Sequence, residues 1–100
     1  PPFVNAQGDL MISARDLAIL LDWQLYWNQG GQRLTLAGPD GFLVAFLDSA
    51  DIVTHLGERT LRAPAEIREG RVYLSYDALR ALGYQVHWDE LSRRLSVKKP

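Results

Sequence analysis

The sequence contains no cysteine, which excludes disulfide scaffolds, thiolate metal sites and cysteine nucleophiles. Charge of one sign is also scarce, because 11 basic and 12 acidic residues leave a formal net charge of -1. Such a chain generates no field that would gather nucleic acid or anionic lipid. Long apolar runs are missing as well, since no stretch approaches the ~18 residues of a membrane-spanning helix. We therefore expect no nucleic-acid partner and no membrane insertion.

Histidine is scarce too, and this bears on metal binding. The sequence has 2 histidines, His55 and His87, with no metal-ligand spacing between them. A copper or zinc site needs several such side chains converging on one ion. We predict neither a metal site nor a cofactor.

Catalytic patterns are equally weak. Ser75, Asp77 and His87 supply the residue types of a catalytic triad, but no nucleophile elbow surrounds Ser75, which is better placed to begin a helix. Asp89 and Glu90 are adjacent in a turn and point apart, unlike the facing carboxylates of a glycosidase. The sequence therefore predicts no catalytic residue and no enzyme activity.

What the chain does have is a pattern written twice, in residues 8–36 and 70–97. Identical residues recur at Gly8/Gly70, Ser13/Ser75, Leu17/Leu79, Leu20/Leu82, Gln24/Gln85, Trp27/Trp88, Arg33/Arg94 and Leu34/Leu95, and related positions include Tyr26/His87, Asn28/Asp89 and Leu36/Val97. We refer to these pairs as aligned positions. Self-similarity of this kind is typical of a repeated structural unit, so we predict an internal duplication.

Each copy is predicted to form a strand, a helix and a hairpin. Residues 10–12 and 72–74 alternate as short half-buried strands do. Ser13 and Ser75 then stand where a helix would begin, and Gly83 is placed to end the second helix. Residues 24–36 and 85–97 alternate again around turn residues, which predicts two hairpins.

The segment between the copies adds further strands. Residues 42–47 are apolar on both sides, and residues 48–62 are typical of a more polar hairpin. The 100 residues amount to one domain with a core of its own. We predict an α+β fold of two layers, in which two short helices lie on one face of an antiparallel sheet of about five or more strands.

The aromatic and basic residues of the two hairpins are the candidate ligand-binding groups. Alternation places Trp27 and Trp88 on the apolar side, as core residues. The same alternation turns Tyr26, Arg33, His87 and Arg94 outward. An uncovered sheet face of this kind could stack on sugar rings or dock another domain, although a merely solvated face is the alternative interpretation.

The apolar strand 42–47 suggests a competing site. A two-layer fold covers only one face of its sheet, so a strand that is apolar on both faces leaves one apolar face exposed. On this reasoning Leu43, Ala45 and Leu47 are a candidate interface with a neighbouring domain or with a second copy in a homodimer.

The second copy also resembles a known family. The stretches Arg71-Val72-Tyr73-Leu74, Ala81-Leu82-Gly83-Tyr84 and Val86-His87-Trp88-Asp89 are similar to the copper amine oxidase N-terminal domain, and Ala63-Pro64 before them fits the same pattern. The first copy matches more loosely, with Leu21 and Asp22 in place of Gly83 and Tyr84. The resemblance implies that residues 1–100 are a single domain of this family.

This resemblance carries expectations about function. In amine oxidases the domain is an appended stalk, while copper, the quinone and the catalytic base belong to a separate domain. In bacteria the family resembles an accessory module of secreted or wall-attached proteins. The start at Pro1-Pro2 rather than methionine is consistent with a removed leader or a longer parent protein.

We therefore expect a non-catalytic accessory or binding module of a secreted or cell-envelope bacterial protein. Its expected partners are other domains of a longer parent, which it would position, and cell-wall glycan. The alternative is a protein–protein or self-association domain that uses residues 42–47.

Overall fold

The structure, a computed structural model, describes residues 1–99 and shows an α+β chain in which strands predominate over two short helices. The strands are β1 (Phe3–Val4), β2 (Leu10–Ser13), β3 (Gln24–Asn28), β4 (Arg33–Gly38), β5 (Gly41–Phe46), β6 (Asp51–Thr54), β7 (Gly57–Thr60), β8 (Glu66–Arg68), β9 (Arg71–Ser75), β10 (Gln85–Asp89) and β11 (Arg94–Lys98). The helices are α1 (Ala14–Leu21) and α2 (Ala78–Ala81). Neither helix is long and apolar enough to span a membrane.

The strands form three sheets rather than the single sheet predicted. A 5-stranded sheet has the order β3-β4-β5-β6-β7, a 4-stranded sheet the order β1-β2-β9-β8, and β10 and β11 form a separate ribbon. All of these pairings are antiparallel. The one-sheet prediction is wrong because β2 and β9, the strands that precede the helices, pair with each other instead of joining the hairpins that follow.

The 4-stranded sheet brings together the two similar segments, residues 8–36 and 70–97. Its central strands pair so that Ile12, one residue before Ser13, lies opposite Leu74, one residue before Ser75. On the outer sides, β1 pairs with β2 and β8 pairs with β9. The sheet is therefore symmetric in arrangement: on each side an outer strand, β1 or β8, pairs with the inner strand that follows it in the sequence, β2 or β9.

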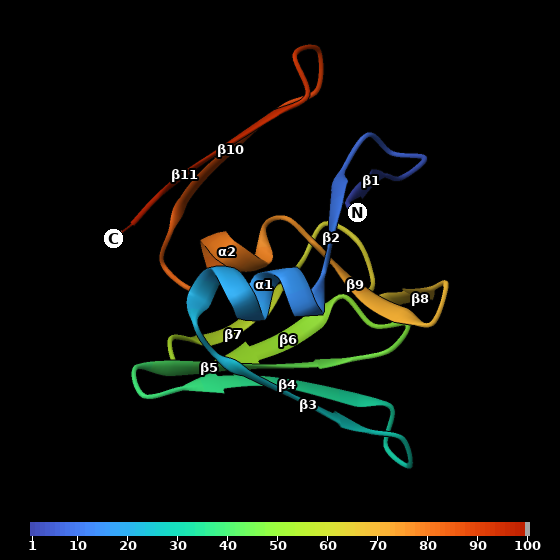
Figure 1. Cartoon of the computed structure of the whole chain (residues 1–100), viewed down its shortest axis with the longest axis vertical. Helices are drawn as coiled ribbons and strands as arrows, with labels where there is room; N and C mark the ends of the chain where they lie inside the picture. The colour runs from blue at the N-terminus through green and yellow to red at the C-terminus, as the bar shows by residue number, and fades with distance from the viewer. Residues whose placement is uncertain (100) are drawn as a thin grey trace.

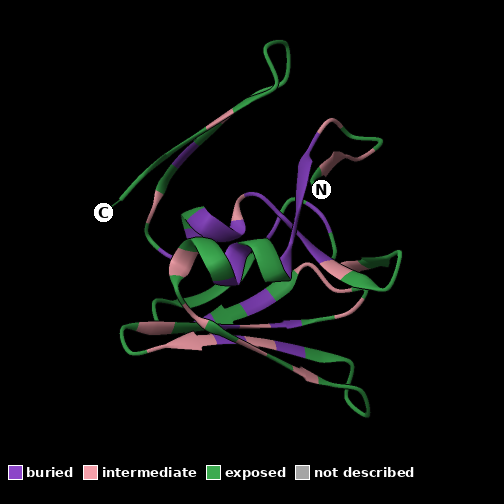
Figure 2. Ribbon diagram, in the orientation of Figure 1, coloured by how far each residue is buried: buried purple, intermediate pink, exposed green. Residues whose placement is uncertain are grey.

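The main core lies between the 5-stranded sheet and the two helices (Figure 1). Leu17 of α1 and Leu79 of α2 belong to the same buried cluster as Leu36 and Leu43 of the sheet. Burial alternates along β4 and β5, as expected for strands with one face in the core (Figure 2). The helices therefore cover one face of this sheet, as predicted, although they do not cover all the strands of the molecule.

The two helices begin differently. Ser13 caps α1, since its Oγ accepts a hydrogen bond from the backbone N–H of Asp16 at 3.1 Å. Ser75 does not cap α2, because that helix begins only at Ala78, with Asp77 at its N-cap position, whereas α1 begins at the residue directly after Ser13. The predicted cap at Ser75 is therefore wrong. Gly83 has a φ of 96° just beyond α2, which confirms it as the residue that ends the helix.

Candidate binding surfaces

The face of the 5-stranded sheet that points away from the helices carries the largest exposed side chains of that sheet. Strand pairing aligns Tyr26, Thr35, Val44 and Val53 in one row across four strands. Phe42 and Phe46 of β5 share this side, because residues two apart on a strand point the same way. We call Tyr26, Phe42, Val44, Phe46 and Val53 the outer face. Tyr26 is 59% exposed, Phe46 42% and Val53 40%.

Polar groups border this outer face. Arg33 pairs with Phe46 across the sheet, and Asp51 begins β6 nearby. Asp51 in turn accepts a hydrogen bond from the hydroxyl of Thr60 at 2.8 Å. The arrangement offers aromatic rings beside a guanidinium and a carboxylate, which can contact a polar ligand that also has apolar faces.

No helix or strand among residues 1–99 covers the outer face. Figure 1 shows both helices and the β10–β11 ribbon on one side of the 5-stranded sheet, and the opposite side is open. An aromatic and aliphatic surface left open on one face of a sheet is typical of a contact site.

The predicted ligand-binding residues divide between two places. Tyr26 lies in the outer face with Arg33 at its border, and both are exposed. His87 and Arg94 are also exposed, but they belong to the β10–β11 ribbon, which lies on the far side of the helices (Figure 1). The structure does not bring the four side chains into one site.

The predicted interface residues lie mostly inside the molecule. Leu43 and Ala45 are both 0% exposed, because they share the inward side of the sheet with Leu34 and Leu36 and fill the core. Leu47 is half-buried and forms a parallel bridge with Ala65. Leu43 and Ala45 therefore cannot meet a partner. The strand does have a second apolar side, but it consists of Phe42, Val44 and Phe46.

The indoles of Trp27 and Trp88 are half-buried and pack against the main core from their two hairpins. Their polar ends differ. Trp27 Nε1 donates to Gln29 Oε1 at 2.8 Å, within its own hairpin, whereas Trp88 Nε1 donates to the carbonyl oxygen of Gly8 at 3.3 Å. Trp88 thus ties the second hairpin to the turn that precedes β2.

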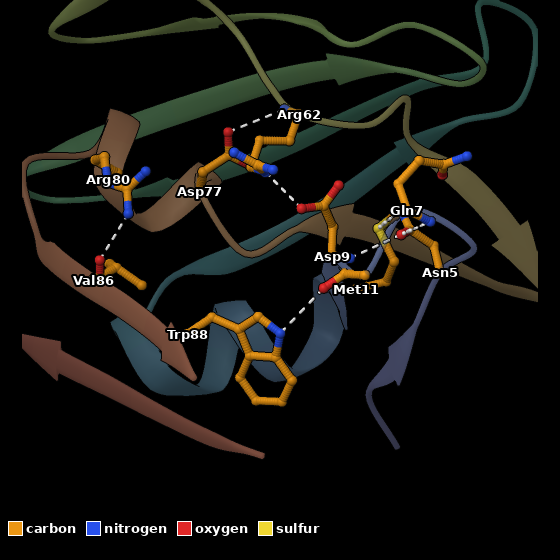
Figure 3. Close-up of polar contacts among 10 residues, drawn as sticks. Asn5, Gln7, Asp9, Met11, Arg62, Asp77, Arg80, Val86 and Trp88 are labelled. Atoms are coloured by element: carbon orange, nitrogen blue, oxygen red, sulfur yellow. Dashed lines mark hydrogen bonds and ion pairs between the residues drawn. The ribbon is translucent and has the colours of Figure 1, made fainter. Parts of the chain in front are cut away.

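Further contacts fix the root of the β10–β11 ribbon, as Figure 3 shows. Arg80 Nη2 donates to the carbonyl of Val86 at 2.7 Å, and Val86 is buried.

An ion pair joins two distant parts of the chain just before β2. The guanidinium of Arg62 pairs with the carboxylate of Asp9, which is 5% exposed. The hydrogen bond to Asp9 raises the pKa of Arg62. Sequence reasoning missed this pair, because nothing local relates two residues so far apart.

Between the ribbon and α1 lies an apolar groove of about 450 Å³. Leu20 of α1 and the ribbon residues Trp88 and Leu95 line it, with Val4 of β1 at one side and Arg93 at the rim. Leu20 is 59% exposed, so its side chain stands open to whatever enters. We call this space the ribbon groove.

The remaining polar candidates have structural roles. His55 Nδ1 accepts a hydrogen bond from the N–H of Phe42 at 3.2 Å, so His55 closes a turn beside β5. Asp89 accepts hydrogen bonds from the backbone of Ser92 and Leu91, which hold its pKa below the usual range. Within residues 1–99 no three histidine, aspartate or glutamate side chains are grouped to hold a metal.

Comparisons with known proteins bear on the identity of the whole chain. The family model for the copper amine oxidase N-terminal domain matches residues 1–97. Comparisons with curated proteins and with solved structures found no match. The family match extends over both hairpins, both helices and all three sheets.

Proposed function

The chain belongs to the copper amine oxidase N-terminal domain family, and from this we propose that it is an accessory module that contacts cell-wall polymer on a secreted or cell-envelope bacterial protein. In copper amine oxidases this N-terminal domain is a non-catalytic accessory domain. We further propose that residues 8–36 and 70–97 arose by duplication of a single ancestral unit. The strand order β1-β2-β9-β8, with Ile12 opposite Leu74, supports that origin.

The single observation that carries the proposal is the open outer face. Small proteins rarely leave a contiguous apolar surface exposed unless it meets a partner. Tyr26 and Phe46, at 59% and 42% exposure, present rings on a sheet whose other side is packed against the helices. A rigid sheet holds such rings in place without the entropy cost of ordering a loop.

Wall glycan suits this chemistry. The C–H faces of a sugar ring are apolar and stack on aromatic rings, while the hydroxyls at its edge need hydrogen-bond partners. Tyr26 and Phe46 would provide rings for successive sugars, and Arg33 and Asp51, on either side of Phe46, the polar edge contacts. Arg33 also suits the carboxylates of wall peptides, because a guanidinium binds carboxylate with two parallel hydrogen bonds.

The test is retention of the purified chain on insoluble peptidoglycan. We expect Tyr26→Ala to lower the apparent affinity about tenfold, which corresponds to about 1.4 kcal/mol. His87→Ala is the matched control, because it changes the aligned position of the other hairpin, outside the outer face. Unaltered retention of Tyr26→Ala, or equal losses from both variants, would contradict the proposal.

Docking to another protein, including a second copy of this chain, is the second candidate function. The outward side of β5 favours it, since Phe42, Val44 and Phe46 form a purely apolar row. Phe46→Glu should then abolish a concentration-dependent dimer in sedimentation velocity. A monomer at all concentrations, combined with retention on peptidoglycan, would favour the glycan instead.

A further inference from the structure

A second contact site follows from comparing the edges of the two hairpins. Strands β3 and β10 occupy aligned positions, and each is an outer strand of its sheet. Strands β4 and β11 are also aligned, but only β4 has a neighbour on its other side, which is β5. Within residues 1–99 the outer edge of β11 pairs with nothing. Its backbone N–H and C=O groups on that side are available to another strand.

The missing neighbour leaves apolar side chains uncovered. Leu34 and Leu36 of β4 are 2% and 0% exposed. At the aligned positions of β11, Leu95 is only half-buried and Val97 is 39% exposed. The ribbon groove, lined by Leu20, Trp88 and Leu95, opens on the same side of the ribbon. An additional strand beside β11 would cover part of Leu95 and Val97, as β5 and the helices together cover Leu34 and Leu36 of β4.

Charge indicates the nature of that strand. Arg93, Arg94, Lys98 and Lys99 are all exposed, and no residue within the described 1–99 forms an ion pair with them. A second copy that paired antiparallel through β11, centred on Ser96, would place Arg94 opposite Lys98. Like charges directly opposite each other destabilise a strand pair. That register therefore disfavours pairing with a second copy, and the unpaired basic side chains of this edge favour an acidic partner.

We propose that β11 binds an extended acidic segment of another polypeptide, which adds to the ribbon as an antiparallel third strand. The main-chain hydrogen bonds of such strand addition provide affinity, and alternate side chains provide specificity. On one side of the added strand, apolar residues would enter the ribbon groove against Leu95 and Val97. On the other, carboxylates would meet Arg94 and Lys98. Strand β5, with Leu43 and Ala45 turned inward, is the precedent for this arrangement within the molecule.

The experiment uses a fluorescently labelled synthetic peptide that alternates leucine with glutamate, titrated with the whole chain and followed by anisotropy. A peptide with lysine in place of glutamate is the control ligand. We expect the glutamate peptide to bind at least about tenfold more tightly, with an affinity that falls as salt is added. The double variant Arg94→Glu/Lys98→Glu should reverse this preference, and binding of the lysine peptide would show that the variant is folded.

Arg59→Glu is the matched protein control. Arg59 lies beside Glu58 on β7, which is the outer strand of the 5-stranded sheet at the end opposite β3. This variant should bind the glutamate peptide as the parent chain does. Equal binding of both peptides, no binding at all, or equal losses from Arg59→Glu and the double variant would overturn the proposal. The proposal would also be overturned if the parent chain formed a dimer that the double variant abolished and Arg59→Glu did not, because β11 would then pair with a second copy. Retention on peptidoglycan should be unaffected by these changes, so the two proposals fail independently.

Discussion

Trp27 and Trp88 occupy aligned positions in two hairpins, β3–β4 and β10–β11, whose surroundings differ. The first hairpin continues into β5 and becomes part of a sheet packed against both helices. The second remains a two-stranded ribbon whose tip extends away from the molecule, with Leu91 99% exposed (Figure 1). One alternating pattern thus gives a core sheet in one place and an open ribbon in the other. The first hairpin has β5 beside it in the sheet and both helices against its apolar face, and a hairpin needs such neighbours to bury that face.

The largest expected contrast is between Leu34 and Leu95, which are identical at aligned positions. Leu34→Ala removes a side chain that is 2% exposed, so we expect a loss of about 2–5 kcal/mol in the free energy of unfolding. Leu95→Ala removes a half-buried one and should cost about 1 kcal/mol. Urea unfolding of both variants measures the two values. Similar losses would mean that the hairpins are equally well packed.

The second largest contrast in stability is expected between Ser13→Ala and Ser75→Ala, at aligned positions. Ser13 caps α1, and Ser13→Ala should cost about 1 kcal/mol. Ser75 Oγ is buried and has no hydrogen-bond partner within residues 1–99. Ser75→Ala should therefore be neutral or stabilising, since it removes an unsatisfied buried hydroxyl. A loss of stability from Ser75→Ala as large as that from Ser13→Ala would contradict the difference between the helix starts. Thermal unfolding of the two variants is the measurement.

A slightly smaller contrast in stability is expected between Trp88→Phe and Trp27→Phe. Trp88→Phe keeps a ring but removes the hydrogen bond to Gly8, which links the ribbon to the turn before β2, at a cost of about 0.5–1 kcal/mol. Trp27→Phe removes only an exposed bond to Gln29 and should change stability by less than about 0.5 kcal/mol. Denaturant unfolding of the pair tests the order of the two values, and a reversed order would contradict it.

The smallest effect is a pH dependence confined to one hairpin turn. Asp89 accepts from the N–H groups of Leu91 and Ser92, while its aligned residue Asn28 accepts from the N–H of Gly31 at 2.9 Å. The pKa of Asp89 is lowered by its bonds to Ser92. Its contribution is therefore fully present above the ordinary aspartate pKa of about 3.9 and is lost as the pH falls through the lowered value.

Because asparagine does not titrate, acid should loosen the turn at Ser92 and leave the turn at Gly31 unchanged. Amide chemical shifts followed through an acid titration would show this, and Asp89→Asn should remove the pH dependence. A turn at Gly31 that opened at the same pH would point to general acid unfolding instead.

Local features of this fold could be predicted from the sequence. The hairpins 24–36 and 85–97 and the helix start at Ser13 were accessible, because each depends on alternation or capping over a few residues. The distribution of strands among three sheets was not, because pairing such as that of β2 with β9 depends on contacts between distant parts of the chain. The cap predicted at Ser75 is wrong because both serines end a strand in similar sequence, yet α1 follows Ser13 directly while Tyr76 and Asp77 separate Ser75 from α2.

The candidate sites were predictable in part for the same reason. Tyr26 was correctly placed outward, because its polar and apolar neighbours alternate. In β5 both sides are apolar, so nothing in the pattern distinguishes inward Leu43 and Ala45 from outward Phe42 and Phe46. Only the pairing of β5 with β4 decides between them. The open edge of β11 was likewise hidden, since it is defined by the absence of a neighbouring strand in the described chain.

Hydrogen exchange, followed by NMR on the free chain, tests the central contrast most directly. Strand β4 pairs on both sides, so every backbone N–H from Leu34 to Ala37 should exchange slowly. Strand β11 pairs with β10 alone, so slow and fast amides should alternate along Arg94–Lys98. Uninterrupted protection along β11 in the free monomer would contradict the account, because it would mean that this strand already has a second neighbour.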